Sequence, residues 1–154
     1  MSGRIRAALY CRVSTAKQSA AEQERALRRF AEQRKWEVCG VFSDSTTGRS
    51  LWPREALDRL REDVRQAKID KVLVWTVSRL GRSLSGVVAV MDEMFHSGVT
   101  LVAVGQEINS DTIMGRGVIS LCAALAEADV EEHCRRVKEG IRSARAKGKR
   151  WGAP

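Results

Sequence analysis

The sequence predicts an α/β fold: a mainly parallel sheet of about four or five strands flanked by helices, with a long C-terminal helix extending from the domain. Short apolar runs alternate with segments of helical period, which is the pattern of strand–helix–strand units. The 154 residues are enough for one domain with its own core. The last helical pattern runs from Gly115 to Lys147, a length of about 50 Å, which is more than a domain of this size needs.

The first half of the chain contains two apolar runs with a helical pattern between them. Leu9–Val13 and Trp36–Phe42 are short and apolar, as the strands of a buried parallel sheet are. An apolar face recurs at helical spacing over about Ala16–Lys35. The polar stretch Asp44–Trp52, which is rich in Ser and Thr, predicts a loop.

A second helix is expected from Pro53, because proline suits the first turn of a helix. Its apolar stripe consists of Leu57, Leu60, Val64 and Ala67, which recur at helical spacing. The stripe therefore predicts a helix that packs on the sheet with one face.

The remaining elements follow the same alternation. The β-branched run Val72–Val77 predicts a third strand. Ser83 can cap the next helix, and Gly98 can end it. Val99–Val104 predicts a fourth strand, and the polar stretch Gly105–Met114 predicts a loop.

A serine and several arginines are expected at one edge of the sheet. Ser14 stands beside Arg12 where the first strand ends, and open α/β sheets bind ligands at that edge. Ser14 could instead simply cap the following helix. Arg79 and Arg82 follow the third strand and would share a face on a helical turn, although two such arginines alone are more often surface charge. A guanidinium group can bind two phosphate oxygens at once. A serine surrounded by Arg12, Arg79, Arg82 and Arg54 would therefore be a nucleophile that faces a phosphodiester.

The positive charge is concentrated at the end of the chain. Between His133 and Arg150 eight basic residues are opposed only by Glu139, so this segment carries +7 of the net charge of +8. A nearly neutral body with a basic end is typical of proteins that bind nucleic acid, although a solvated basic surface is the alternative.

The long helix is expected to carry two adjacent seams. The apolar seam consists of Val130, Cys134, Val137, Ile141 and Ala144. The basic seam, predicted to contact DNA, consists of Arg135, Lys138, Arg142, Arg145 and Lys149. An apolar seam that extends beyond a domain usually packs on a partner helix. The alternative is an ordinary amphipathic helix that docks on its own sheet.

Four motifs together resemble the serine site-specific recombinases, the resolvase/invertase family. They are TyrCysArgValSerThr (10–15), AspSerThrThrGly (44–48), ArgLeuGlyArg (79–82) and GluGlyIleArgSerAlaArgAlaLysGly (139–148). They occur in the family's order and spacing, and the resemblance covers essentially the whole chain. It implies DNA strand cleavage and rejoining in site-specific recombination, through a covalent 5′-phosphoserine intermediate.

The resemblance also implies roles for single residues. Ser14 matches the nucleophile, and Arg12, Arg54, Arg79 and Arg82 match the arginines that grip the phosphate. The supporting positions are Tyr10, Gln18, Gln23, Thr47 and Ser78. No metal or nucleotide cofactor is expected. The expected partners are double-stranded DNA and further copies of the chain, with a homodimer through the long helix and a tetramer in the active complex.

The expected organisation is a catalytic body over residues 1–114 and a helix for oligomerisation and DNA contact over residues 115–150. The chain stops at TrpGlyAlaPro, where family members continue into a DNA-recognition domain, so that domain is expected to be absent. No apolar run approaches the ~20 residues of a membrane span, and no signal peptide is evident, which predicts a cytoplasmic, nucleoid-associated protein with no membrane partner.

Two departures from the family pattern bear on the mechanism. Ser78 stands where the family has an acidic residue directly before the arginine pair, which leaves the proton donor for the leaving oxygen undefined. In the long helix an Ala–Glu–Arg-like triplet is replaced by Ala128, Asp129 and Val130. The alternative function is a non-catalytic DNA-binding or regulatory relative with the same fold, although the intact set of Ser14 and its arginines argues against it. A response-regulator-like domain is disfavoured, because it needs clustered aspartates where this chain has Arg–Val–Ser.

Overall fold

The structure, a computed structural model, describes residues 3–14, 17–46 and 54–148. Its strands are β1 (Arg6–Ser14), β2 (Glu37–Thr46), β3 (Lys71–Val74), β4 (Thr100–Ala103) and β5 (Ile108–Asn109). Its α-helices are α1 (Lys17–Gln33), α2 (Glu55–Arg65), α3 (Leu84–His96) and α4 (Ile113–Ala146). Two short 3₁₀ helices, η1 (Val77–Leu80) and η2 (Val104–Gln106), follow β3 and β4.

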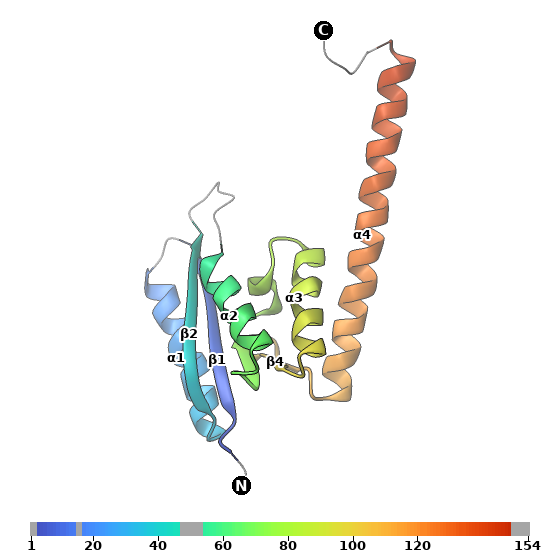
Figure 1. Cartoon of the computed structure of the whole chain (residues 1–154). Helices are drawn as coiled ribbons and strands as arrows, with labels where there is room; N and C mark the ends of the chain where they lie inside the picture. Colours follow the sequence, from blue (N-terminus) through green and yellow to red (C-terminus); the bar gives the residue numbers. More distant parts are fainter. Residues whose placement is uncertain (1–2, 15–16, 47–53, 149–154) are drawn as a thin grey trace.

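The predicted α/β fold is confirmed. The strand order is β2-β1-β3-β4-β5; the first four strands are parallel, and β5 is antiparallel to β4. Helix α1 covers one face of the sheet, and α2 and α3 cover the other (Figure 1). Because the four parallel strands run in the same direction, their carboxyl ends form one edge of the molecule.

The side chains of β1 alternate between the two faces of the sheet. Leu9 and Cys11 belong to the core on the α1 side, together with Leu27. Tyr10 belongs to the core on the other side, which α2 and α3 cover. Arg12 lies two residues beyond Tyr10 and follows it onto the α2–α3 side.

The long helix α4 has 34 residues and is therefore about 51 Å long. It runs beside α3 and then continues far past the sheet, in the direction in which β1 runs (Figure 1). Val137 and Ile141 of the predicted apolar seam are 47% and 44% exposed, so the chain's own sheet does not cover them. In the part of the chain that the structure describes, no helix is both long and apolar enough to cross a membrane.

The first two strands are longer than predicted. β1 begins at Arg6, three residues before the predicted start, because Ala7 and Ala8 are fully buried although alanine gives little strand signal. β2 continues to Thr46, so the loop predicted from Asp44 begins too early. The reason is tertiary: the last residues of β2 pair with Arg12–Ser14 of β1.

The elements after β2 differ from the prediction at three places. The third strand ends at Val74, three residues early, because the backbone then turns into η1. The loop predicted over Gly105–Met114 contains the short strand β5. Ala67, predicted on the stripe of the second helix, lies beyond α2, is exposed and has a left-handed backbone (φ 54°). The predicted cap is confirmed, because the Ser83 side chain accepts a hydrogen bond from the Gly86 backbone N–H.

The start of α4 packs tightly against the turn before it, and this predicts a stability difference between two glycines. A Cβ on Gly115 would meet the backbone oxygen of Asn109, whereas a Cβ on Gly117 would meet nothing within 4 Å. We expect Gly115→Ala to lower the free energy of unfolding by about 2 kcal/mol, as other steric clashes with backbone do. Gly117→Ala is the matched control and should raise it by up to about 1 kcal/mol. Urea unfolding of both variants measures this, and equal effects would contradict the packing.

Candidate active site

The candidate site lies at the carboxyl edge of the sheet. Ser14 is the last residue of β1 and pairs with Thr46, the last residue of β2, while Arg12 pairs with Asp44. η1, which contains Arg79, follows β3 at the same edge. The Ser14 backbone is therefore at the predicted position, and its side chain lies outside what the structure describes.

Arg12 and Arg54 form hydrogen bonds to the backbone between Arg79 and Arg82. Arg12 Nη1 donates a hydrogen bond to the Gly81 carbonyl oxygen at 3.1 Å. Arg54 Nη1 donates to the neighbouring carbonyl of Leu80 at 3.0 Å. β1 and the start of α2 are thus both fastened to the turn that positions the remaining arginines.

The same arginines also carry unused hydrogen-bond donors. Arg12 Nε, Arg54 Nε, Arg54 Nη2 and Arg79 Nε are buried, and none has a hydrogen-bond partner among the described residues. A buried donor without a partner costs about 1–3 kcal/mol, more when it is charged. Phosphate oxygens accept strong, short hydrogen bonds from guanidinium groups. The edge therefore has the donors that a phosphodiester would satisfy.

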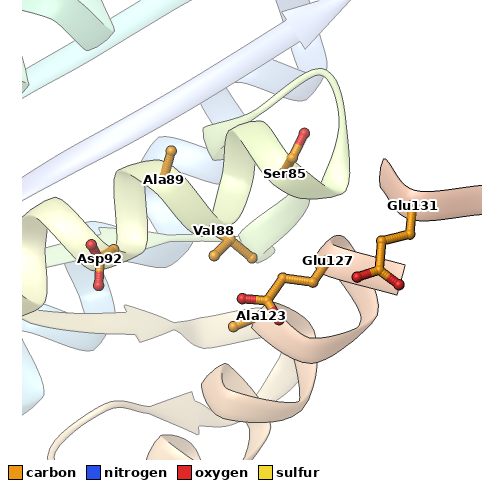
Figure 2. A pocket seen from close by; sticks show the side chains of 7 residues that line it. All are labelled: Ser85, Val88, Ala89, Asp92, Ala123, Glu127 and Glu131. Carbon is orange, nitrogen blue, oxygen red and sulfur yellow. The ribbon is translucent and has the colours of Figure 1, made fainter. Parts of the chain in front are cut away.

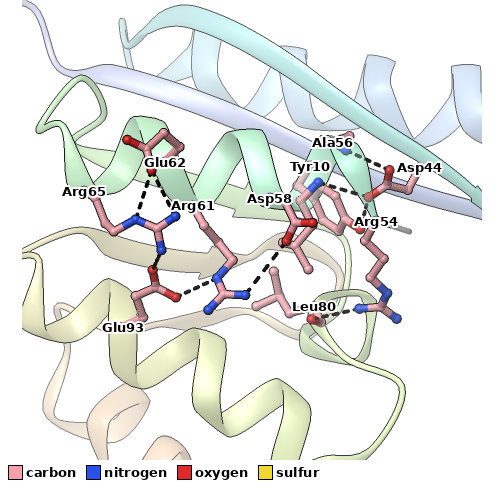
Figure 3. A network of polar contacts seen from close by, with 11 residues as sticks. Tyr10, Asp44, Arg54, Ala56, Asp58, Arg61, Glu62, Arg65, Leu80 and Glu93 are labelled. Atoms are coloured by element: carbon pink, nitrogen blue, oxygen red, sulfur yellow. Dashed lines mark hydrogen bonds and ion pairs between the residues drawn. The ribbon is translucent and has the colours of Figure 1, made fainter. Parts of the chain in front are cut away.

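A buried carboxylate, which the sequence analysis missed, fixes the position of Arg54. Asp44 is 9% exposed, and it accepts hydrogen bonds from the Tyr10 hydroxyl at 2.9 Å and from the backbone N–H groups of Ala56 and Leu57 at 3.0 Å each (Figure 3). Through these bonds Asp44 joins β1, β2 and the first turn of α2, directly after Arg54. No local signal marks this role, because Asp44 lies in β2, eleven residues before α2 begins.

The electrostatics of this cluster follow from its burial. Burial raises the pKa of Tyr10 strongly, and the neighbouring charge of Asp44 raises it further, so Tyr10 stays a neutral donor to Asp44. Burial also lowers the pKa of Arg54, an effect that Tyr10 opposes and the charges of Arg12 and Arg82 increase. Guanidinium groups stay charged at any physiological pH, so the site concentrates permanent positive charge.

The Asp44 contacts predict a large loss of stability when the carboxylate is changed. Asp44→Asn places an amide that cannot accept all three hydrogen bonds in a buried position, and we expect the free energy of unfolding to fall by about 2–3 kcal/mol. Asp58→Asn on the exposed side of α2 is the matched control and should change it by less than about 0.5 kcal/mol. Thermal or urea unfolding decides, and similar values for both variants would contradict the role of Asp44.

Arg79 and Arg82 do not share a helical turn, contrary to the prediction. η1 ends at Leu80, and Gly81 is extended (φ −146°, ψ 164°), so Arg82 leaves the turn that contains Arg79. Burial raises the pKa of Cys11 to about 11, Glu24 adds to this, and Arg28 and Arg79 oppose it.

The supporting residues are described to different extents. Gln23 in α1 has a buried Oε1 atom without a partner in the described part of the chain. Ser78 is exposed, and its hydroxyl is 2.9 Å from that of Thr76. Gln18 lies in the first turn of α1, but nothing is described of its side chain, and Thr47 lies outside the described residues.

The basic seam of α4 is exposed, and one of its members already has partners. Arg135 forms ion pairs with Glu132 and Glu139 on its own helix. Lys138, Arg142 and Arg145 form no ion pair with any residue that the structure describes. These three are therefore better suited to a phosphate backbone than Arg135. Lys149 and the side chain of Val130 lie outside what is described.

A cavity with different chemistry lies elsewhere, between α3 and α4. It has a volume of about 610 Å³ and is lined by Ser85, Val88, Ala89, Asp92, Ala123, Glu127 and Glu131 (Figure 2). An apolar floor with three carboxylates repels phosphate, so this groove is not a second phosphate site. Across residues 3–14, 17–46 and 54–148, no three His, Cys, Asp or Glu side chains are grouped as a metal site requires.

Known proteins resemble this chain in sequence over nearly its whole length. The family described as "Resolvase, N terminal domain" matches residues 7–150. The chain is 33% identical over 143 residues to the transposon Tn3 resolvase of Escherichia coli, covering 93% of this chain and 74% of that protein. It is 32% identical over 145 residues to the DNA-invertase hin of Salmonella typhimurium, covering 94% and 72%.

Solved structures show the same fold. A resolvase family site-specific recombinase from Streptococcus pneumoniae superposes with a TM-score of 0.80 and 31% identity, over 92% of this chain and 99% of that one. The N-terminal catalytic domain of TP901-1 integrase has a TM-score of 0.71 and 26% identity, over 82% and 97%.

Proposed function

The chain belongs to the resolvase family of serine recombinases and contains its N-terminal catalytic domain, and from this we propose that it cleaves and rejoins DNA through a covalent 5′-phosphoserine at Ser14. The observation that supports this most lies at the edge where β1 ends in Ser14. It is the set of buried guanidinium donors for which the described residues provide no hydrogen-bond acceptor.

The proposed chemistry is a transesterification in two symmetrical halves. The Ser14 hydroxyl gives up its proton and forms a bond to phosphorus, while the bond from phosphorus to the 3′ oxygen breaks and that oxygen takes up a proton. Arg12, Arg54, Arg79 and Arg82 would bind the charge that develops on the phosphoryl oxygens. The phosphoserine keeps the energy of the ester bond, so a new 3′-hydroxyl can reverse the step without ATP. Phosphoryl transfer depends mostly on such positioning and charge stabilisation.

The experiment that tests this function is a covalent trap. Suicide duplexes nicked near the target phosphodiester, drawn from the DNA that flanks the protein's own gene, would be incubated with the protein and resolved on a denaturing gel. We expect a protein–DNA adduct, with a phosphoserine at residue 14 in the digested peptide. An adduct on another residue would refute the assignment of the nucleophile.

One observation favours the alternative, a DNA-binding relative without catalysis. Ser78 and Thr76 place two hydroxyl groups where the family pattern has an acidic residue, and hydroxyl groups are poor proton donors. Single-turnover cleavage by Ser78→Asp, compared with the wild type, separates the two functions. Cleavage that appears only in the variant would support the non-catalytic alternative, and cleavage by the wild type would refute it.

We further propose that α4 mediates both a homodimer and contact with double-stranded DNA, and that dimers pair into the active tetramer. Support comes from the exposure of Val137 and Ile141 next to Lys138, Arg142 and Arg145 on a helix that outruns the domain. An exposed apolar stripe of this kind favours a partner helix.

The dimer through α4 predicts a concentration-dependent mass. Val137→Glu combined with Ile141→Glu should shift the protein toward monomer, because it places two carboxylates in the apolar contact. DNA binding should weaken as well, because the basic residues are on the same helix. Ala124→Glu, on an exposed position nearer the start of α4, compares the effect of added charge alone. Sedimentation velocity over a range of concentrations measures this, and a wild type that stays monomeric throughout would contradict it.

A further inference from the structure

A second, smaller cavity lies beside the candidate active site, on the α1 side of the sheet. Its volume is about 380 Å³, and it is lined by Glu22, Gln23 and Ala26 of α1 and by Trp75. Trp75 directly follows the last residue of β3, so the cavity opens at the carboxyl edge, four residues before Arg79. The function proposed above assigns no role to Trp75, Glu22 or Ala26.

Trp75 packs directly against the backbone of Gly105. The Gly105 backbone N–H donates a hydrogen bond to the Trp75 carbonyl oxygen at 2.8 Å. A Cβ on residue 105 would lie 2.7 Å from Trp75 Cε2, so only glycine lets this backbone approach the ring so closely. The residue Trp75 is nevertheless 37% exposed. The cavity therefore has a fixed, partly open aromatic wall.

The unsatisfied atom and the charged group of the cavity are both hydrogen-bond acceptors. Gln23 Oε1 is buried and has no hydrogen-bond partner in the described part of the chain, and Glu22 is an exposed carboxylate on the cavity wall. A negative charge at this position disfavours a phosphate. A flat ring that carries N–H donors would stack on Trp75 and could satisfy Gln23 Oε1. In a DNA substrate that group is a nucleobase.

We propose that this cavity binds one unstacked nucleobase next to the phosphodiester held by the arginines, and that it favours a base with an exocyclic amino group. The proposal rests on the proposed function, because it takes DNA as the substrate. A base beside a strand break stacks on one neighbour only, so moving it out of the helix costs less than in intact duplex. Trp75 and Gln23 would then position the broken strand.

The test measures binding rather than cleavage. Fluorescence anisotropy at low, fixed salt would compare three labelled duplexes that carry a single-nucleotide bulge of dC, of dT or of an abasic residue. We expect the dC bulge to bind about tenfold more tightly than the abasic bulge, the factor that corresponds to about 1.4 kcal/mol of stacking. Trp75→Ala should reduce this ratio to less than about twofold.

Two variants and one control complete the experiment. Gln23→Leu should keep the preference for a base but remove the preference for dC over dT. Ala26→Leu fills the cavity from α1 and leaves Trp75 intact, so it should also abolish the preference for a base. It therefore tests the cavity independently of whether Trp75→Ala folds. Phe95→Ala removes an aromatic ring that is 61% exposed on α3, outside this cavity, and should leave all ratios unchanged.

Equal affinity of the wild type for the dC and abasic bulges would overturn the proposal, and so would an unchanged ratio in both Trp75→Ala and Ala26→Leu. The covalent trap at Ser14 is read separately. A protein that forms the phosphoserine adduct but ignores the bulged base refutes the base site alone. A protein that forms no adduct refutes the proposed function whatever the bulge ratios are.

Discussion

Replacing Ser14 with alanine is expected to abolish the covalent protein–DNA adduct, with a loss of more than about 1000-fold relative to the wild type. In the proposed mechanism the Ser14 oxygen forms the new bond to phosphorus, and no charge or hydrogen bond nearby could replace it. DNA binding should change by less than about twofold, because we propose that it depends mainly on the basic residues of α4. A denaturing gel with the nicked duplex measures the adduct, and a gel shift measures binding.

The matched control for this prediction is Ser45→Ala. Ser45 is an exposed serine of β2 at the same edge of the sheet, and it pairs with Val13, the neighbour of Ser14. It should keep the wild-type level of adduct. Circular dichroism and thermal unfolding would show that both variants remain folded. If Ser14→Ala formed the adduct at the wild-type level, Ser14 would not be the nucleophile, despite the family resemblance.

The sequence was sufficient for the architecture because local signals and tertiary structure agree there. Val72–Val74 of the predicted β-branched run is buried, and so is the apolar stripe of Leu57, Leu60 and Val64. Strand ends were predicted less well. Ala7 and Ala8 are buried by their neighbours rather than by any strand preference of alanine, and the last residues of β2 are fixed by pairing with β1.

At the site, too, local features could be predicted from the sequence, whereas features that depend on tertiary contacts could not. Arg12 and the Ser14 backbone could be placed from the alternation along one strand, which is a local property. The role of Asp44 could not, because it depends on a helix that begins eleven residues later and on a hydroxyl in another strand. The separation of Arg79 from Arg82 depends on the extended conformation of Gly81, and the spacing alone favoured a helical turn.

Two groups of arginines should respond differently to substitution. Arg79→Lys and Arg82→Lys keep the positive charge but lose the planar fork that binds two phosphate oxygens at once. We expect each to reduce the single-turnover cleavage rate by about 100- to 1000-fold, as removal of one transition-state donor does elsewhere, while affinity for DNA falls only slightly. Arg142→Gln with Arg145→Gln should instead weaken binding and reduce the slope of log Kd against log salt by about two, one unit for each phosphate that the variant no longer neutralises.

The contrast depends on where these side chains lie. Arg79 has a buried Nε without a partner in the described part of the chain, at the edge where β1 and β3 end, whereas Arg142 and Arg145 are exposed on α4 beyond the sheet. Arg61→Lys, in the ion pair between α2 and Glu93 (Figure 3), is the matched arginine control and should affect neither measurement. If Arg79→Lys and the Arg142/Arg145 variant changed the cleavage rate and the salt slope in the same proportion, the arginines of the sheet edge and those of α4 would serve a single function, and the division between phosphate activation and backbone contact would be wrong.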